Sequence, residues 1–176
     1  VQIRNVNNAQ NRMHTLLVNA SEVVTIYEDD NTIRYISPSV ERILGYSQED
    51  LIGINDIKYV DEKEQEVVKE MFDRLLGGEK KVTIQMSYYR KTGDKIWLEA
   101  TGENKIDDPA INGIVVNSRD ITEKLRAERE ERKRGQMQAL SENSPDLITR
   151  ISSNGTFFYI NPVIERLTGM SPDAFI

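Results

Sequence analysis

An internal repeat constrains this chain more than any other feature of its sequence. Residues 19–52 match residues 143–176 without a gap at a constant offset of 124, and eleven of these 34 positions are identical. The identical positions include residues typical of turns and helix ends, such as Pro38 with Pro162 and Gly45 with Gly169. Chance similarity would not keep such residues in step. The chain is therefore predicted to hold one complete domain, residues 19–122, and the first part of a second, residues 143–176.

The match extends backwards, which indicates that a helix precedes each copy. Met13 and Leu16 fall on Met137 and Leu140. Residues 1–18 are thus predicted to form a linker helix, and residues 123–142 a charged connecting helix. The second copy ends where the first has used less than half its length, so we expect it not to bury a full core alone. A boundary within a longer protein, or a tail that borrows a partner chain, is favoured over a natural terminus.

Composition narrows the classes of protein to which the chain can belong. A net charge of −6, with 30% charged residues of both signs, gives no electrostatic reason to bind nucleic acid. No run approaches eighteen apolar residues, so this segment is predicted to lie in water rather than in a membrane. The absence of cysteine excludes disulfides and thiolate chemistry and is compatible with a reducing compartment. We predict a cytoplasmic location.

Local patterns predict two strands, short helices, a long helix and three further strands. The strands at 23–28 and 33–36 are joined by an Asp-Asp-Asn turn, and the later strands at 82–90, 95–103 and 111–118 by short polar connections, which makes them antiparallel. Ser37 and Pro38 predict the start of a short helix at 39–44, and Asn161 and Pro162 repeat this device. Ser47 and Asp50 have the spacing of a capping box. The long helix is predicted over 61–76.

Alternation along the later strands assigns residues to the two faces of the sheet. Ile84, Met86, Tyr88 and Leu98 are predicted to face the core, whereas Tyr89 and Trp97 fall on the outer face. An outer face with two aromatic residues needs a cover, and the leading helix offers Met13, Leu16 and Leu17. We predict that these five residues, Met13, Leu16, Leu17, Tyr89 and Trp97, form the interface of a homodimer.

This order of elements and several local motifs resemble the PAS domain family. The motifs are the run 36–46 with its serine-proline start and glycine-tyrosine end, the segment 49–53, the glycine turn that leads into an aromatic-containing strand at 90–99, and the Arg-Asp-Ile-Thr-Glu sequence at 119–123. The resemblance covers residues 19–122. It implies an α+β PAS fold, a five-stranded antiparallel sheet with helices on one face, flanked by linker helices.

In this family the last motif ends the domain and opens a signalling helix. The resemblance therefore assigns a relay role to Asp120, Ile121, Thr122 and Glu123, and the residues themselves allow Asp120 or Thr122 to cap the outgoing helix and Glu123 to complete a capping box. The helix beyond carries favourable charge pairs four residues apart and few apolar residues. A parallel dimer stalk and a solvated spacer helix are both compatible with that pattern.

Ligand chemistries known from the family can be compared with the residues present. Cysteinyl flavin and thioester-linked chromophores need a cysteine, and haem needs an axial histidine, whereas His14 in the leading helix is the only histidine. No metal site is predicted. No cofactor is expected, although a non-covalent flavin or an unknown small ligand stays an alternative. The candidate pocket residues are Ile43, Met71, Ile84, Met86, Tyr88, Leu98, Val116 and Asn117. Tyr88 and Asn117 are the possible polar contacts, no residue stands out as an orphan polar group at that face, and a filled core explains the same residues.

The resemblance implies a sensory, dimerising and signal-relay module of a larger protein, by family frequency a two-component sensor histidine kinase. The downstream output domain would belong to the same chain. The sequence contains no phosphate loop, nucleophile elbow or clustered acid pair with a base, so no catalytic residue is predicted here. The alternatives are a ligand-free structural dimerisation or spacer module, and the input domain of a diguanylate cyclase or another output.

Overall fold

The structure is a computed structural model that describes residues 17–176. The chain divides into two compact units, one that ends at Glu123 and a second over Lys124–Ile176, and each is described by itself. Most of the predicted leading helix, with Met13, His14 and Leu16, lies outside the described residues. Leu17 and Val18, which follow, are helical and partly buried. No helix within residues 17–176 combines the length and the apolar character needed to cross a membrane.

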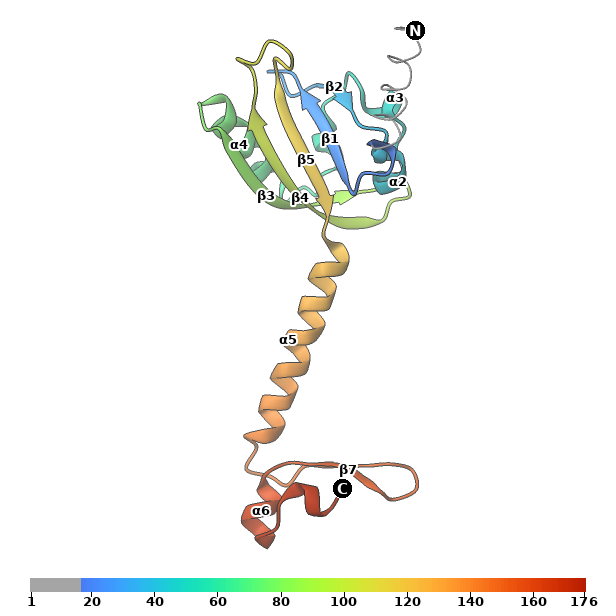
Figure 1. The fold of residues 1–176 in the computed structure, drawn as a ribbon, viewed down its shortest axis with the longest axis vertical. Helices are drawn as coiled ribbons and strands as arrows, with labels where there is room; N and C mark the ends of the chain where they lie inside the picture. The colour runs from blue at the N-terminus through green and yellow to red at the C-terminus, as the bar shows by residue number, and fades with distance from the viewer. Residues whose placement is uncertain (1–16) are drawn as a thin grey trace, which may run out of the picture. The chain divides into compact units, whose positions relative to one another are not determined.

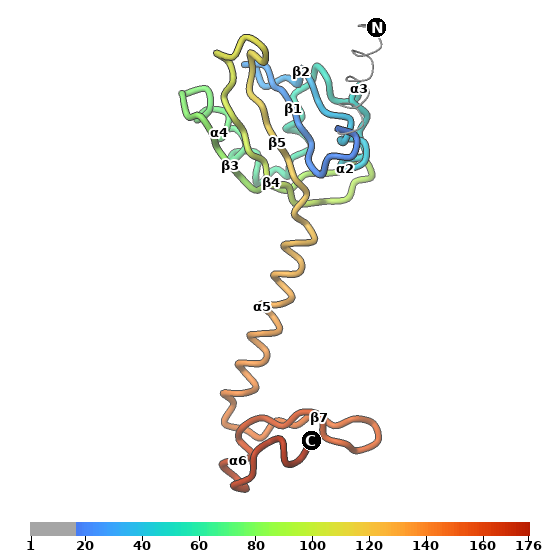
Figure 2. Tube along the Cα trace, in the orientation of Figure 1, coloured from blue at the N-terminus to red at the C-terminus, as the bar shows by residue number. Residues whose placement is uncertain are grey.

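The first unit is built on a five-stranded antiparallel sheet, which confirms the predicted fold class (Figure 1). Its strands are β1 (Glu22–Tyr27), β2 (Ile33–Ile36), β3 (Lys81–Tyr89), β4 (Lys95–Asn104) and β5 (Ile114–Asp120). They lie in the order β2-β1-β5-β4-β3, so the last strand is at the centre and leads directly into α5 (Figure 2). The prediction began β5 three residues too early, because residues 111–113 belong to a turn in which Asn112 has a positive φ of 47°.

Four helical segments lie on one face of this sheet (Figure 1). They are α2 (Ser39–Leu44), α3 (Gln48–Leu51), the 3₁₀ helix η1 (Asp56–Tyr59) and α4 (Gln65–Leu76). The left-handed Gly45 at φ 79° ends α2, and the predicted capping box of Ser47 and Asp50 is present in α3. The long helix begins four residues later than predicted. Residues 61–64 instead contact β3, where the Glu64 carboxylate accepts a hydrogen bond from Ser87 N at 2.8 Å.

The core of the first unit lies between this helical layer and the sheet. Leu75 of α4 and Leu98 of β4 are both almost fully buried, within one continuous cluster of apolar side chains. Gly102 makes the close approach of α4 possible, since a Cβ at that position would lie 2.6 Å from Leu75 Cδ1. Burial of such side chains contributes about 25 cal/mol per Å² of apolar surface and holds the two layers together.

One segment, residues 53–61, is hydrogen-bonded to both outermost strands of the sheet. At β2, Gly53 N donates to Ile33 O at 2.7 Å, and Ile33 N donates to Ile54 O at 2.9 Å. At β3, an antiparallel bridge joins Val60 to Tyr88, and the Asp61 N–H donates to the Ser87 carbonyl. The segment, which contains η1, is therefore fixed at its two ends by strands that are four positions apart in the sheet.

The serine predicted to cap α2 makes a different contact. The Ser37 hydroxyl accepts a hydrogen bond from Val24 N at 2.9 Å and lies 2.8 Å from the Ser39 hydroxyl, which donates to Glu22 O. No side chain caps α2. The prediction of a Ser37 cap was wrong because its hydroxyl faces the backbone N–H of Val24 in β1 rather than the first turn of the helix.

The second unit contains most of α5 (Thr122–Glu142), followed by β6 (Thr149–Ile151), β7 (Phe157–Ile160), α6 (Val163–Thr168) and the 3₁₀ helix η2 (Pro172–Ala174). The fully buried Asn161 again does not cap its helix. Its Oδ1 accepts from Ile148 N, and its Nδ2 donates to Ser141 O and Asp146 O, all at 2.8–2.9 Å. This side chain fastens β6 and the end of α5 to the turn before α6.

Candidate functional site

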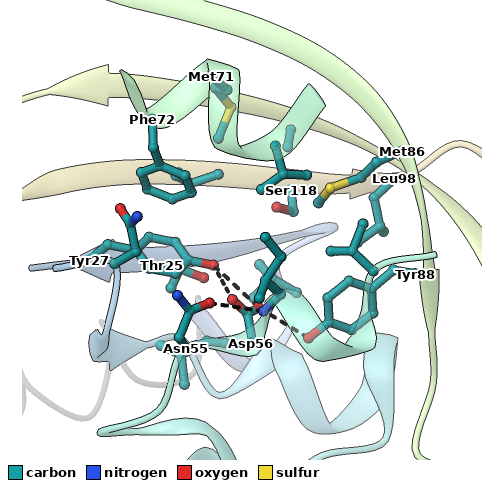
Figure 3. Close-up of a pocket in the computed structure, with 18 of the residues that line it drawn as sticks. Thr25, Tyr27, Asn55, Asp56, Met71, Phe72, Met86, Tyr88, Leu98 and Ser118 are labelled. Carbon is teal, nitrogen blue, oxygen red and sulfur yellow. Dashed lines mark hydrogen bonds between the residues drawn. The ribbon is translucent and has the colours of Figure 1, made fainter. Parts of the chain in front are cut away.

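A cavity of about 260 Å³ lies within the first unit, between the sheet and the helical layer (Figure 3). Most of its lining is apolar and comes from all five strands, from α2 and α4, and from the segment 53–61. The apolar lining residues are Val23, Ile36, Leu44, Ile57, Val60, Val68, Met71, Phe72, Met86, Leu98, Ala100 and Val116. Ligand sites for drug-sized molecules occupy about 300–1,000 Å³. A cavity of this volume suits a smaller molecule.

A carboxylate and two phenols form a polar cluster in the cavity wall. Tyr27 Oη lies 3.2 and 3.3 Å from the two carboxylate oxygens of Asp56, and Tyr88 Oη lies 3.1 Å from Asp56 Oδ2. Figure 3 shows Asp56 on η1 between the two hydroxyls, which come from β1 and β3. Asp56 as a residue is partly exposed, but its carboxylate points inward at the two donors.

Burial controls the protonation of this cluster. Loss of hydration raises the pKa of Asp56 above its usual range, against the lowering effect of the hydrogen bonds from Tyr88 and Tyr27. Burial, and after it the charge of Asp56, raises the pKa of both tyrosines, so each phenol keeps its proton and donates it. Within residues 17–176, no lysine or arginine forms an ion pair with Asp56.

A second acceptor in the cavity wall has no hydrogen-bond partner among residues 17–176. The Asn31 side-chain oxygen is buried and accepts no hydrogen bond from the described residues. Asn31 lies in the β1–β2 turn with a left-handed φ of 63°, a conformation that asparagine tolerates better than most residues. Thr25 and Ser118 add hydroxyl groups to the lining. Buried polar atoms in native proteins are usually hydrogen-bonded, so the Asn31 oxygen is an acceptor at which a further donor would be favourable.

Five of the eight predicted pocket residues line this cavity: Met71, Met86, Tyr88, Leu98 and Val116. Ile43 is buried in the core away from the cavity, and Ile84 packs against the core from a partly buried position. Asn117 was placed wrongly. Successive residues of a strand point to opposite faces, so Asn117 cannot share the inner face with Val116, and Ser118 is the polar residue of β5 in the lining.

Sequence reasoning missed Asp56, Tyr27 and Asn31. Asp56 lies in a stretch with neither helical nor strand periodicity, and its inward position depends on the hydrogen bonds of segment 53–61 to both sides of the sheet. Alternation did carry a signal for Tyr27, because the buried residues of β1 are Val23, Thr25 and Tyr27. The expectation that no orphan polar group stands out at this face was also wrong, because the buried Asn31 oxygen in the lining has no partner among the described residues.

The predicted relay residues lie where the sheet passes into α5. The Asp120 carboxylate accepts from Thr122 N at 2.9 Å and pairs with Arg90 Nη2 at 2.8 Å. The Thr122 hydroxyl accepts from Trp97 N at 2.9 Å, and Ile121 N donates to Trp97 O at the same distance. Asp120 thus binds the first residue of α5, as predicted, whereas Thr122 binds β4. Glu123 lies in the first turn of α5, where an acid is favourable.

A short series of contacts joins the cavity to this junction. Tyr88, which donates to Asp56, is next to Ser87, and Ser87 pairs with Trp97 across the β3–β4 ladder. The backbone of Trp97 in turn binds Ile121 and Thr122. The cavity and the start of α5 therefore share one stretch of two neighbouring strands.

The aromatic residues predicted for a dimer interface occupy the outer face of the sheet, as alternation indicated. Trp97 is partly buried, and Tyr89 is 37% exposed. The Tyr89 hydroxyl and the Lys95 ammonium both bind Asp61 Oδ2, which lowers the pKa of Asp61 to about 2, with the bond from Lys95 as the largest cause. Their part in a dimer stays a prediction.

Comparison with known proteins agrees with this geometry. The profile of the family described as "PAS domain" matches residues 21–123, which is more than half of the chain. The chain is 26% identical over 121 residues to the sensor histidine kinase TmoS of Ectopseudomonas mendocina, and the match covers 66% of the chain but only 12% of that protein.

Two solved structures have a similar fold. The PAS domain of a protein from Colwellia psychrerythraea has a TM-score of 0.56 at 17% identity, over 65% of this chain and 98% of the other. The PAS domain of an HTR-like protein from Haloarcula marismortui has a TM-score of 0.54 at 17% identity, over 68% and 98%. At such identities the likeness concerns the fold alone.

Proposed function

The chain belongs to the PAS domain family, and on that premise we propose that its first unit is a sensory and relay module in which a small molecule in the cavity changes the start of α5. The observation that carries this proposal is the shared stretch of β3 and β4. Tyr88 contacts the polar cluster of the cavity, and Trp97, which pairs with the neighbouring Ser87, holds Ile121 and Thr122. A displacement of Tyr88 would therefore move Ser87 and its partner Trp97, and through Trp97 the first residue of α5.

The signalling protein to which this module contributes is, in our proposal, of the sensor histidine kinase class and cytoplasmic at this segment. The support is the relative TmoS, of which the chain spans 12%. The module itself supplies no catalytic group, and the output domain belongs to another part of the protein. No cofactor is assigned. The sequence of the full-length protein distinguishes a kinase from a diguanylate cyclase or another output.

Dimerisation through the outer face of the sheet is a second part of the proposal. Tyr89 and Trp97 occupy a face that carries no helix from the described part of the first unit (Figure 1). Trp97→Glu should shift the chain to a monomer in sedimentation velocity, and Ile52→Glu, a change at another exposed apolar residue, should not. If the unaltered chain is a monomer at high concentration, the proposed dimerisation is refuted, whereas the proposed relay is not affected.

Hydrogen exchange of α5 tests the relay with a substitution that imitates occupancy. Ala100 is fully buried and lines the cavity, so Ala100→Val should fill part of the space and change exchange at residues 121–126 several-fold. The exposed Ala110 is the matched control, and Ala110→Val should leave the exchange unchanged.

Two adjacent tyrosines give a second test of the same route. Tyr88→Phe removes the hydroxyl that binds Asp56, whereas Tyr89→Phe removes one that binds Asp61 on the outside. Only the first should alter exchange at the start of α5. If Ala100→Val and Tyr88→Phe both leave α5 unchanged while the protein stays folded, the relay is refuted. Native mass spectrometry of the purified chain then separates a ligand-binding module from a ligand-free spacer.

A further inference from the structure

The polar cluster of the cavity contains a carboxylate that accepts hydrogen bonds and no positively charged group. Asp56 presents two carboxylate oxygens, which have about four lone-pair sites and receive two phenolic donors. Asn31 presents a buried oxygen with no partner among the described residues. A ligand that completes this wall must therefore donate hydrogen bonds to at least two acceptors.

We propose that the cavity binds a small organic cation, a primary ammonium on a compact apolar body, with the ammonium at Asp56. This inference rests on the proposed sensory function and specifies its ligand. An ammonium has three donors for the free acceptor sites of the Asp56 carboxylate and the cavity wall, whereas a neutral hydroxyl has one. It also supplies the charge that a buried carboxylate otherwise lacks, and buried charges in proteins are as a rule paired.

The remainder of the cavity fits the other end of such a molecule. Tyr27 and Phe72 meet edge to face with ring centroids 5.0 Å apart, and both rings line the cavity with Tyr88, so aromatic surface, which attracts cations, is present in its wall. Met71, Leu98 and Val116 form an apolar wall for a hydrocarbon body. Benzylammonium, with an ammonium on a single ring, is a probe of suitable size for about 260 Å³.

One cationic residue contributes to the lining and opposes a cationic ligand. Lys69 of α4 lies at the cavity, but its side chain is 55% exposed and its ammonium pairs with Glu66 Oε2 at 3.4 Å. Solvent screens that charge, so it weakens the attraction of Asp56 for a cation without cancelling it. Lys69→Gln should therefore strengthen the binding of benzylammonium.

Isothermal titration of the full chain with benzylammonium, benzyl alcohol and benzoate at pH 7.5 tests the charge preference. Benzylammonium should bind at one site and at least tenfold more tightly than benzyl alcohol, and benzoate should not bind. Asp56→Asn should weaken benzylammonium at least tenfold while it changes the affinity for benzyl alcohol less than threefold. Asp61→Asn, which removes an acid of the same segment that does not line the cavity, is the matched control and should change neither affinity.

A second variant keeps the test decisive if Asp56→Asn disturbs the fold. Tyr27→Phe leaves the carboxylate in place and frees one of its acceptor sites, so benzylammonium should bind at least as tightly as to the unaltered chain. Equal affinities for ammonium and alcohol, or a benzylammonium affinity indifferent to Asp56→Asn, would overturn the inference. So would binding of benzoate alone, although cavity sensing would then stand. Saturation by benzylammonium without any change in α5 exchange would instead refute the relay and leave the ligand class intact.

The pH dependence of the same titration gives an independent readout. The ionisable groups that line the cavity are Asp56, Tyr27, Tyr88 and Lys69, and Asp56 is the only carboxyl group among them. Burial raises the pKa of Asp56, and a cation prefers the ionised carboxylate, so the affinity for benzylammonium should fall as the pH is lowered. An affinity that does not depend on pH would contradict the assignment of Asp56 as the counter-ion.

Discussion

The two copies of the repeat begin with the same local structure and differ in what covers it. In the first copy Val23, Tyr27, Ile43 and Tyr46 are buried, with exposures of 1–8%. The residues 124 positions later are Leu147, Ile151, Leu167 and Met170, and they are 44–67% exposed. A hairpin and a short helix therefore form from local signals, but they bury their apolar side only against α4 and the three later strands.

The copies also fasten the same loop with different side chains. In both, a residue at the equivalent position accepts a hydrogen bond from the first strand, Ser37 from Val24 and Asn161 from Ile148. Asn161 also donates to Asp146 O, and in the first copy Ser39 makes the corresponding bond to Glu22 O. Two serines thus make bonds that one asparagine makes alone. Ser37 and Asn161 therefore share the same kind of backbone contact, and neither of them is a helix cap.

The largest expected difference between the copies is the cost of a cavity in the core. Ile43→Ala should lower the free energy of unfolding of the first unit by about 2–5 kcal/mol, because Ile43 is 6% exposed and leaves a void. Urea titration followed by the fluorescence of Trp97, the single tryptophan, measures it. Leu167→Ala at the equivalent position should change hydrogen exchange of residues 149–160 by less than about 0.5 kcal/mol. A large loss there would mean that this face is covered in solution.

Removal of Asn161 should have the next largest effect. Asn161→Ala removes three hydrogen bonds made by a fully buried side chain, and a typical intramolecular hydrogen bond contributes about 0.5–1.5 kcal/mol. Protection of the Ile148 amide should disappear, while the fluorescence of Trp97 should not change. If both units respond, they fold as one cooperative body and the separation of the two copies fails.

Replacement of Asn161 by the pair of serines found in the first copy should have a smaller effect on stability. Asn161→Ser alone loses the bonds to Ser141 and Asp146, and the double variant with Val163→Ser places two serines as in the first copy. The second serine should restore about 1 kcal/mol of the loss measured by exchange at residues 148–151. If Val163→Ser adds no protection, the equivalence of the two devices is wrong.

The smallest expected difference is the pH dependence due to Asp56, which has no counterpart in the described part of the second unit. Its folded pKa is raised by burial, so the folded state binds more protons, and stability present below the ordinary pKa of about 3.9 is lost as pH rises through the folded value. The change in the free energy of unfolding caused by Asp56→Asn should therefore be more favourable at pH 7 than at pH 4. Asp61, with its pKa lowered to about 2, should give the opposite sign for Asp61→Asn.

The elements that sequence reasoning predicted well are those fixed by neighbours in the chain. The bounds of β2 and α2, the stop at Gly45 and the capping box of α3 all follow from residues within a few positions. The inward position of Asp56 does not, because it depends on hydrogen bonds to strands twenty or more residues away. The assignment of Asn117 to the pocket was avoidable from the sequence. Neighbouring residues of a strand point to opposite faces, so Asn117 cannot line the cavity if Val116 does.

The segment 53–61 also limits how another polypeptide could dock on this domain. A sheet usually recruits an extended peptide, or aggregates, at an outermost strand whose backbone groups are free. Here β2 and β3 are the two outermost strands, and the same nine residues pair with part of each. Strand addition along the full length of either would first have to displace the segment that carries Asp56. A partner that leaves the cavity intact must instead approach the sheet face on, across the side of β3, β4 and β5 that carries no helix from the described part of the first unit.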